Sequence, residues 1–524
     1  MSDKPETKQR SQTIRLPKRV VILGADVTAW MAAALLGRHF QRLGCRITVV
    51  SGGESSVPFR ALSSLPSLVG LIRNLGVDEH EMMRDTRATY KLATQLSDWV
   101  QPERDSWLPF GFDRVRIEGL SLFDAWFAER SQGRLLRPFH SYSLHWAAAL
   151  AGKSPHAFAG ESPFATSGQY GLHVDTIAFT GWLRTVALKF GVEEICGDIT
   201  KVFPNGRGGI AQVRLQDSVA VPGDLFLDCR TATDTQNKTA AIPDDSTDTV
   251  EPCDRLVSFR VPGIRQVPPY TQVIGQASGW AWRIPLAEEV DCGYLFSSKS
   301  LSDDQALQQL RDVCLTSTSQ DEAEQVDPYF ADFHPVAGRD VFWKDNVVTL
   351  GMAASYLEPL AMTNLHLWQV GVELLMELFP ERSGSRASRE EYNRRMQTVI
   401  REARDFTQLH YALSQRDDTT FWQTAGGLTL SDELQHRLAV YDASGATVAV
   451  SAESVPELQY QYLLAGCGRL PQRAAIKAAS MPPARIQQVL RELVKTNETI
   501  LKDLPLHEEL LDWIHTKPFQ QQTA

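Results

Sequence analysis

The stretch RVVILGADVTAWMAAALLGRHFQRLGCRITVV, residues 19–50, decides the fold. A β-branched run at 19–23 leads to Gly24, a helical pattern follows at 28–43, and a second strand pattern follows at 46–50. Strand, glycine turn, helix and strand within this length form the βαβ opening of a dinucleotide-binding unit. A pyrophosphate would meet the helix N-terminus at the glycine turn. The sequence therefore predicts an α/β fold with a Rossmann-type beginning.

The phosphate fingerprint G-x-G-x-x-G/A falls on residues 24–29, where Gly24 and Ala29 fit and Ala25 fills a free position. The second glycine is replaced by Asp26. Its carboxylate would face a phosphate, and like charges about 4 Å apart repel by roughly 4 kcal/mol at an effective dielectric of 20. Glu54, beyond the second strand, is the candidate for the ribose hydroxyls. A βαβ unit that binds no nucleotide stays open as the alternative.

Composition excludes several classes of protein. The 524 residues are 43% hydrophobic and 22% charged, as in globular domains, and the net charge of −10 argues against a nucleic-acid partner. The chain has neither a secretory signal nor an apolar run of about 18 residues, so we expect no membrane span. Seven scattered cysteines without metal-ligand spacing favour a cytoplasmic location and predict no metal site.

The rest of the chain alternates between strand and helix patterns before it becomes helical. Residues 1–17 look like a flexible tail, and 67–100 look mainly helical. Further segments are a helix around 171–190, strands within 209–228 and near 257–263, 281–286 and 292–298, a polar loop at 230–250, and helices at 363–379, 387–415 and much of 429–515.

Three further motifs carry a resemblance. They are Ala88-Thr-Tyr-Lys91, Gly279-Trp-Ala-Trp-Arg-Ile-Pro285 and Leu350-Gly-Met-Ala-Ala-Ser-Tyr-Leu-Glu-Pro-Leu360. With the βαβ unit they resemble the flavin-dependent tryptophan halogenase family over roughly residues 18–475. The W-x-W-x-I-P signature of that family is complete as Trp280, Trp282, Ile284 and Pro285.

The resemblance implies a GR2-like, Rossmann-type FAD-binding unit with a mostly helical C-terminal part. We expect the flexible tail at 1–17, the FAD-type α/β domain with interleaved substrate-side elements at 18–410, and the helical part at 411–524. It also implies that reduced FAD comes from a separate flavin reductase, that hypohalous acid forms at the flavin from a halide, and that a lysine delivers the halogen to tryptophan or another electron-rich aromatic.

The family roles fall on these positions: Lys91 as the catalytic lysine; Gly24, Ala25, Ala29, Glu54, Trp280, Trp282, Ile284, Pro285, Leu350 and Gly351 around the cofactor; Thr363 and Asn364 at the halide. Without the resemblance, Lys91 also fits a surface lysine on an amphipathic helix, since YKLATQLSDW is amphipathic. The two tryptophans likewise fit ordinary core packing.

Several positions depart from the family pattern. After Glu358-Pro-Leu360 the family has Glu-Ser-Thr, and this chain has Ala361-Met-Thr363, so the carboxylate that works with the lysine is missing. Leu62 replaces the acid of one flavin-contact loop, and Thr231 replaces a glycine of another. Together with Asp26, these changes predict weakened FAD binding.

Two interpretations follow. In the first, the chain is an FAD-dependent halogenase with a partly degraded site. In the second, it is a non-catalytic paralogue that acts as a binding or assembly partner, as a homodimer or beside an active halogenase. A flavin monooxygenase is a weaker third option, which the tryptophan signature disfavours.

Overall fold

A computed structural model describes residues 16–52, 58–111, 116–117, 119–135, 137–158, 162, 164, 169–230, 252–262, 267–315, 326–336, 338–380, 385–447 and 455–516. Most of the expected tail at 1–17, the loop at 230–250, Glu54 and Thr231 lie outside these residues. Within the described part of the chain, no helix is long and apolar enough to cross a membrane.

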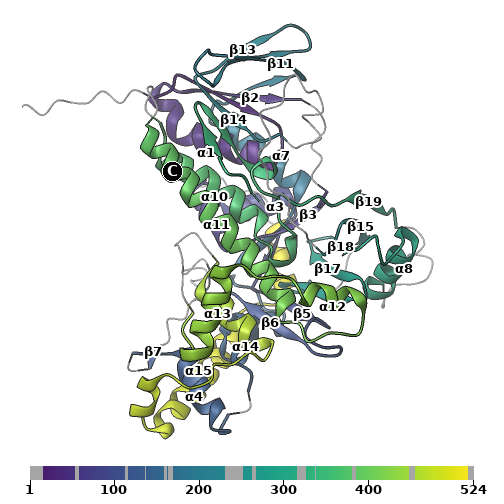
Figure 1. Ribbon diagram of the computed structural model, residues 1–524, viewed down its shortest axis with the longest axis vertical. Coiled ribbons are helices and arrows are strands. Elements are labelled where there is room, and N and C mark those ends of the chain that lie inside the picture. Colours follow the sequence, from purple (N-terminus) through teal and green to yellow (C-terminus); the bar gives the residue numbers. More distant parts are fainter. Residues whose placement is uncertain are drawn as a thin grey trace, which may run out of the picture.

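The N-terminal sequence builds the predicted βαβ unit at the centre of a six-stranded sheet (Figure 1). Strand β1 (Arg19–Leu23) pairs in parallel with β2 (Arg46–Ser51) on one side and β14 (Leu225–Asp228) on the other. The sheet order is β10 (Glu193–Cys196), β2, β1, β14, β21 (Val347–Thr349) and β20 (Trp343–Lys344), with only β20 antiparallel to its neighbour. The predicted α/β class with a parallel sheet is confirmed.

Helix α1 (Val27–Phe40) is buried because its first three turns are apolar on nearly all sides. Eleven consecutive residues from Val27 to Gly37 are buried in it. It packs against α7 (Thr176–Lys189), α10 (Asn364–Glu377) and α2 (Ser67–Leu75). The predicted strand–turn–helix opening is therefore confirmed, and its helix lies at the core of the molecule.

A second, seven-stranded sheet carries the tryptophan signature. Its order is β19 (Tyr329–Asp332), β15 (Arg255–Pro262), β18 (Glu289–Phe296), β17 (Gly279–Pro285), β16 (Tyr270–Gln276), β5 (Ala93–Ser97) and β6 (Ser106–Pro109). Helix α8 (Asp303–Cys314) packs against β15 and β18 and shares a small hydrophobic core with them.

Three small sheets complete the strands: β11 (Ile199–Pro204) with β12 (Ile210–Leu215) and β13 (Ala220–Pro222); β3 (Ala61–Ser63) with β9 (Gly171–Asp175) and β4 (Thr89–Lys91); and β7 (Arg116–Ile117) with β8 (Leu120–Ser121).

The end of the chain is helical, as predicted. Helix α11 (Arg386–Ala412) lies beside α10, and α12–α16 follow it (Figure 1). The remaining helices are α3 (Glu79–Thr86), α4 (Leu122–Ser131), α5 (Leu144–Leu150), α12 (Thr420–Gly426), α13 (Asp432–Ser444), α14 (Glu457–Gly466), α15 (Pro483–Asp503) and α16 (His507–Thr516). The expected boundary after residue 410 falls inside α11, and the division into two parts stays a prediction.

The interpretation of residues 67–100 as mainly helical is wrong for its second half. Helices α2 and α3 are followed by strands β4 and β5. Strand β5 pairs in parallel with β16, which lies far along the chain, and antiparallel with β6. These long-range pairs override the local helical pattern, because strand formation depends on neighbours that sequence spacing does not reveal. The same reasoning missed β16 and placed a helix over β9.

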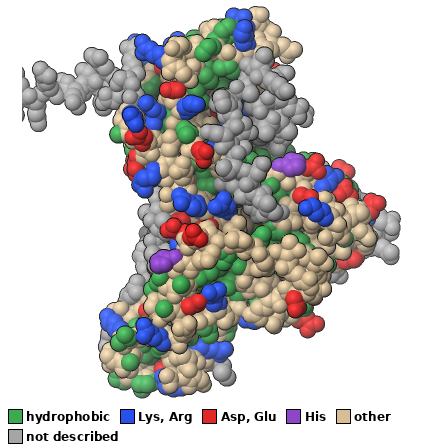
Figure 2. Space-filling view, in the orientation of Figure 1, with side chains coloured by type: hydrophobic (Ala, Val, Ile, Leu, Met, Phe, Trp, Pro, Cys, Tyr) green, Lys and Arg blue, Asp and Glu red, His purple; other side chains and the backbone are tan. Residues whose placement is uncertain are grey.

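Figure 2 shows basic and acidic side chains interspersed over this face of the molecule, with apolar side chains between them.

Candidate active site

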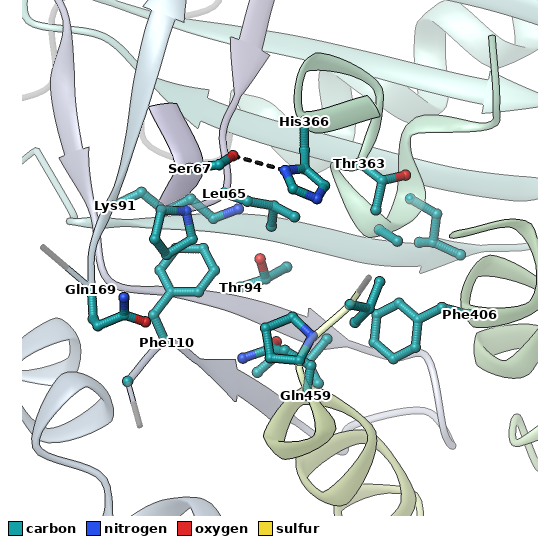
Figure 3. A pocket seen from close by; sticks show the side chains of 17 residues that line it. Leu65, Ser67, Lys91, Thr94, Phe110, Gln169, Thr363, His366, Phe406 and Gln459 are labelled. Atoms are coloured by element: carbon teal, nitrogen blue, oxygen red, sulfur yellow. Dashed lines mark hydrogen bonds between the residues drawn. The ribbon is translucent and has the colours of Figure 1, made fainter. Parts of the chain in front are cut away.

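A cavity of about 240 Å³ lies where the N-terminal ends of α2 and α10 approach β4, β5 and α14 (Figure 3). Its wall is mostly apolar, with a few polar groups. The lining residues are Leu65, Pro66, Ser67, Lys91, Thr94, Leu108, Phe110, Gly111, Gln169, Leu360, Ala361, Thr363, His366, Phe406, Val455, Pro456 and Gln459. An enclosed apolar pocket with a few convergent polar groups is the usual form of a small-molecule site.

Lys91 stands at the wall of this cavity. It is the last residue of β4, is only 1% exposed, and donates from Nζ to the carbonyl of Ser64 at 3.4 Å. Its ammonium lies 5.0 Å from the centre of the Phe110 ring. Burial lowers the pKa of Lys91 from 10.5 to about 7, because the charged form loses its hydration. The alternative of a surface lysine on a helix is therefore wrong.

A tight loop carries the three positions expected near the halide. It runs through the 3₁₀ turn η4 (Pro359–Ala361) and Met362, whose φ is +55°, into the first turn of α10. The side chain of Asn364 closes the loop, since its Oδ1 accepts from the backbone N–H of Leu357 at 2.9 Å and its Nδ2 donates to the carbonyl of Leu357 at 2.7 Å. The Asn364 amide is thus engaged in holding the loop together.

The hydroxyl of Thr363 differs from that amide. Thr363 precedes the first residue of α10 and lines the cavity, and its buried Oγ1 has no hydrogen-bond partner within the described residues. The first-turn N–H groups of a 14-residue helix lie next to it. This end of α10 is therefore suited to an anion. Ala361, where the family pattern has a glutamate, lines the same cavity as Lys91.

Each signature tryptophan donates its indole N–H to a buried carboxylate. Trp280 Nε1 donates to Glu358 Oε1 at 2.5 Å, and Tyr411 donates to the same oxygen. Trp282 Nε1 donates to Asp291 Oδ2 at 3.0 Å, and burial raises the pKa of Asp291 to about 6.

The two indole rings lie 5.6 Å apart, both fully or nearly fully buried. Ile284 and Pro285 follow them on β17, where the carbonyl of Pro285 accepts from Thr89 Oγ1 at 2.6 Å. Through Glu358, the signature strand is tied to the loop that carries Ala361 and Thr363.

The dinucleotide edge is formed by the ends of three strands. Gly24 follows β1 with φ +117°, and a Cβ there would lie 3.2 Å from the backbone carbon of Cys229. Gly351 follows β21 with φ +65°, and its Cβ would lie 2.7 Å from Thr28 Oγ1 on α1. Only glycine allows these backbones to meet at the N-terminus of α1. Ligands of open α/β sheets bind at such strand ends.

Comparisons with known proteins identify the chain. The family model for tryptophan halogenase matches residues 19–483. This protein belongs to the tryptophan halogenase family.

Solved relatives share the fold of this tryptophan halogenase family member over nearly the full length. Xcc4156, a flavin-dependent halogenase from Xanthomonas campestris, is 30% identical with a TM-score of 0.87, covering 97% of this chain and all of its own. BrvH, a flavin-dependent halogenase from Brevundimonas sp. BAL3, is 29% identical with a TM-score of 0.85, covering 95% of this chain and 99% of its own. Among curated proteins, tryptophan 7-halogenase RebH from Lentzea aerocolonigenes is 27% identical over 94% of this chain and 98% of its own length.

These matches bear on the two interpretations. The family uses FAD, takes a halide and an aromatic substrate, and receives its reduced flavin from a separate reductase. No finding supports the non-catalytic paralogue, and none shows a degraded active site. Within the described residues, no group of three or more His, Cys, Asp or Glu side chains is placed to hold a metal ion.

The residues at the dinucleotide edge of this halogenase-family protein fit FAD. Gly24 and Gly351 open the turn, and Thr28 Oγ1, in the first turn of α1, is buried without a hydrogen-bond partner among the described residues. Leu350 donates its N–H to the carbonyl of Asp228 at 2.9 Å and so places Gly351 beside α1. Leu62, at the position where the resemblance expects an acidic flavin contact, is buried in β3. Phe59, three residues earlier in the chain, packs edge-on against Trp282.

Asp26 has a local role that the sequence did not reveal. Its Oδ1 accepts from the N–H of Ala29 at 2.8 Å, so Asp26 is the N-cap of α1. The carboxylate is 4% exposed and lies at the helix end where a pyrophosphate would sit. Aspartate is among the preferred N-cap residues. Asp26, where the family pattern has a glycine, thus caps the helix, and its carboxyl group lies at the dinucleotide edge.

Sequence reasoning also missed His366, Ser67, Glu358 and Asp291. His366 lies one turn into α10 and lines the cavity, with Nδ1 2.9 Å from Ser67 Oγ (Figure 3). A helical spacing from Ala361 would have placed it near the cavity. Glu358 carried no such signal, because it lies far along the chain from Trp280, whereas Asp291 is on β18, the strand that pairs with β17.

Proposed function

We propose that this chain is an FAD-dependent halogenase of an uncharged, electron-rich aromatic ring, and that Lys91 delivers the halogen. The observation that carries the proposal is the placement of Lys91. It is a buried lysine with a pKa of about 7 at the wall of an apolar cavity, and the anion-suited end of α10 lines the same cavity. Strongly shifted pKa values of cleft residues are typical of functional sites.

Bound and reduced FAD supplies the oxidising chemistry that turns halide and oxygen into hypohalous acid. Its pyrophosphate would lie at Gly24, Ala25 and Ala29, in the turn after β1 and the first turn of α1, where the N–H of Ala29 donates to Asp26 Oδ1. Leu350 and Gly351 lie at the same edge.

Trp280 and Trp282, with Ile284 and Pro285, would wall the flavin off from the substrate. Their rigid anchoring to Glu358 and Asp291 supports this role, because a barrier between two reactive compartments must not move.

Lys91 would hold hypohalous acid in the cavity. Its ammonium donates a hydrogen bond from Nζ to the oxygen of the acid and so polarises the oxygen–halogen bond. A surrounding apolar wall strengthens this interaction. A halide ion would sit at the start of α10, bound by backbone N–H groups near Asn364 and by the hydroxyl of Thr363.

The lining of the cavity favours a neutral substrate. Among its described residues, Lys91 and His366 are the only titratable side chains, and none is a carboxylate or a guanidinium. The ammonium of free tryptophan would have no anionic partner among these described lining residues, and leaving it unpaired costs binding energy. We therefore expect an indole-like ring to react better than tryptophan itself.

The decisive assay combines the purified chain with FAD, a flavin reductase, NADH and bromide. Indole and tryptophan are offered in parallel, and brominated product is detected by mass. We expect product with indole and less with tryptophan. Absence of product from both, with FAD bound and reduced in the mixture, would contradict the proposal.

The free state of all seven cysteines supports a cytoplasmic location. A homodimer or a paralogue partner stays a prediction from the sequence.

A further inference from the structure

One guanidinium supports the carboxylate that holds the second signature tryptophan. Trp282 donates its indole N–H to Asp291 Oδ2 on β18, and Arg260 Nε of β15 lies 3.6 Å from the other oxygen, Asp291 Oδ1. The strand register brings the two side chains together, because Arg260 stands directly opposite Asp291 where β15 pairs with β18. Arg260 therefore reaches the indole through a single carboxylate.

The same guanidinium contacts three further acceptors. Its Nη2 lies 2.6 Å from Asp175 Oδ2 and donates to the carbonyl of Arg60 at 2.7 Å, and its Nη1 donates to Glu289. Asp175 ends β9 and is the N-cap of α7, and Glu289 begins β18. A planar guanidinium offers several donors in a fixed geometry, which suits it to hold such a set of acceptors at once. Arg260 thus joins three strands to the segment at Arg60.

The segment at Arg60 also contacts the tryptophan. Phe59 packs edge-on against the indole of Trp282, with the ring centres 5.5 Å apart. Thr176 holds this segment from α7, since its Oγ1 donates to the carbonyl of Phe59 at 2.7 Å and its N–H donates to the carbonyl of Arg60 at 3.0 Å. The hydrogen bond of the indole and this ring contact therefore both lead back to Arg260.

The charges around Arg260 make its contribution specific. The carboxyl groups of Asp175, Glu289 and Asp291 gather around the one guanidinium. Burial raises the pKa of Asp291 to about 6, whereas the hydrogen bond from Trp282 and the positive charge of Arg260 act in the opposite direction. Without the guanidinium, three carboxyl groups would face one another without this counter-charge, and the buried one would lose its support.

We propose that Arg260 is the positioning residue of the tryptophan wall, a role that rests on the proposed halogenase function. It holds the carboxylate that binds the indole N–H of Trp282 and the backbone segment that places Phe59 against the same indole. Arg260 is not among the residues that line the cavity of Lys91, so it acts through Trp282. The wall serves the reaction only while it stays closed, because excluding water from a reactive site prevents side reactions.

The first test observes the indole itself and needs no flavin. The chain is labelled with 5-fluorotryptophan, and the fluorine resonance of Trp282 is assigned by its absence from Trp282→Phe. In Arg260→Met we expect this resonance to shift and broaden. Arg255→Met is the matched control, because Arg255 lies on the same strand and also pairs with two carboxylates, Asp303 at 2.7 Å and Asp332 at 2.6 Å. There we expect the Trp282 resonance to stay in place.

The second test measures how the reduced flavin is used. The chain with bound FAD is reduced, freed of excess reductant, and mixed with oxygen, bromide and indole for a single turnover. In Arg260→Met we expect about tenfold less brominated indole per flavin, an effect that a small misplacement by a distant substitution can produce. Hydrogen peroxide should rise accordingly, since the two electrons of the flavin then pass to oxygen without oxidising bromide. A merely structural role would lower the amount of folded, FAD-loaded chain and leave this ratio unchanged.

Arg260→Lys replaces Arg260→Met if the latter does not fold. A lysine keeps the positive charge and lacks the planar fork that bridges the acceptors, so we expect the Trp282 resonance to move and the yield per flavin to fall about threefold. Thermal unfolding and FAD titration establish that each variant is folded and loaded. A folded variant in which either the Trp282 resonance or the yield per flavin stays at its wild-type value overturns the inference.

The failures of the two proposals are distinguishable. A wild-type chain that makes no brominated product with bound, reduced FAD contradicts the halogenase function, and this inference with it. A wild-type chain that is active, together with a folded Arg260 variant that keeps the wild-type yield per flavin, overturns the inference alone.

Discussion

The dinucleotide edge and the cavity beside Lys91 each contain a residue that departs from the expected family pattern, Asp26 and Ala361, and the two residues have different surroundings. At the edge, Asp26 adds a carboxylate where the family has glycine, and the helix uses it as a cap through Ala29. In the cavity, Ala361 removes a carboxylate, and the wall that it leaves also holds Lys91 and His366. The carboxylate of Asp26 thus makes a local contact, whereas Ala361 places a methyl group in the wall of a cavity that Lys91 also lines.

The difference follows from how the two regions are assembled. At the edge, the cap that Asp26 forms is local, because its partner Ala29 lies three residues along the chain. The cavity is lined by seven segments, around residues 65, 91, 110, 169, 363, 406 and 456. A substitution there meets groups that the sequence does not place beside it.

The largest effect is expected from Lys91→Met. Without the ammonium that holds hypohalous acid, brominated product should fall by about 10³-fold or more, as when a preorganised electrostatic group is removed. Product is measured by mass, and FAD affinity should stay unchanged. Lys153→Met is the matched control, because Lys153 also donates to a backbone carbonyl, that of Leu504 at 2.7 Å, and does not line the cavity. Equal product from both variants would remove Lys91 from the mechanism.

The same lysine should make stability depend on pH in a definite direction. Burial lowers the pKa of Lys91 from 10.5 to about 7, so between these values the unfolded chain binds a proton that the folded chain does not. The contribution of Lys91 to the free energy of unfolding therefore rises with pH across this window. We expect Lys91→Met to be more stable than the wild type at pH 7, and this advantage to shrink by about 3 kcal/mol by pH 9.5. Urea denaturation at both pH values measures it, and an advantage that does not change with pH would contradict the burial of a titrating amine.

Glu358 tests how far the cavity depends on long-range contacts. Glu358→Leu removes the carboxylate that accepts from the indole N–H of Trp280 and from the hydroxyl of Tyr411. We expect a loss of about 2 kcal/mol in the free energy of unfolding, since the buried indole N–H of Trp280 loses its acceptor and an unpaired buried donor costs about 1–3 kcal/mol. Glu358→Gln keeps an acceptor and should cost less. Denaturant unfolding of the two variants, with Trp280→Phe in a double-mutant cycle, measures the coupling, and a cycle that closes without interaction energy would show that the contact does not anchor the signature.

The contrast between local contacts and long-range contacts explains what the sequence could predict. Strand β1, helix α1 and strand β2 were predicted from glycine positions and periodicity, because each is set by residues next to it in the chain. The family motifs located Lys91, Thr363 and the two tryptophans, yet not the strand that carries Lys91. The carboxylates that hold the tryptophans, and the position of His366 in the cavity wall, arise where separate segments meet. Local pattern carries no information on such contacts.

The smallest effect, and the one that tests the comparison directly, is expected at Asp26. Asp26→Gly removes a negative charge from the place where a pyrophosphate would meet α1, and it frees the N–H of Ala29 for that anion. Because the helix end already offsets part of the charge, we expect FAD affinity to rise by about tenfold, or roughly 1.4 kcal/mol, rather than by the full repulsion of two charges in contact. Loss of the cap should cost only a few tenths of a kcal/mol in stability, since glycine is tolerated at N-caps.

Asp78→Gly is the matched control, because Asp78 caps α3 in the same way, accepting from the N–H of Glu81 at 2.8 Å, at an exposed site. Flavin titration should therefore show tighter binding in the first variant and no change in the second. If the wild-type chain already binds FAD with submicromolar affinity and Asp26→Gly adds nothing, the Asp26 carboxylate does not oppose the cofactor. The edge would then be a remodelled FAD site in which the cap and the pyrophosphate share the helix end.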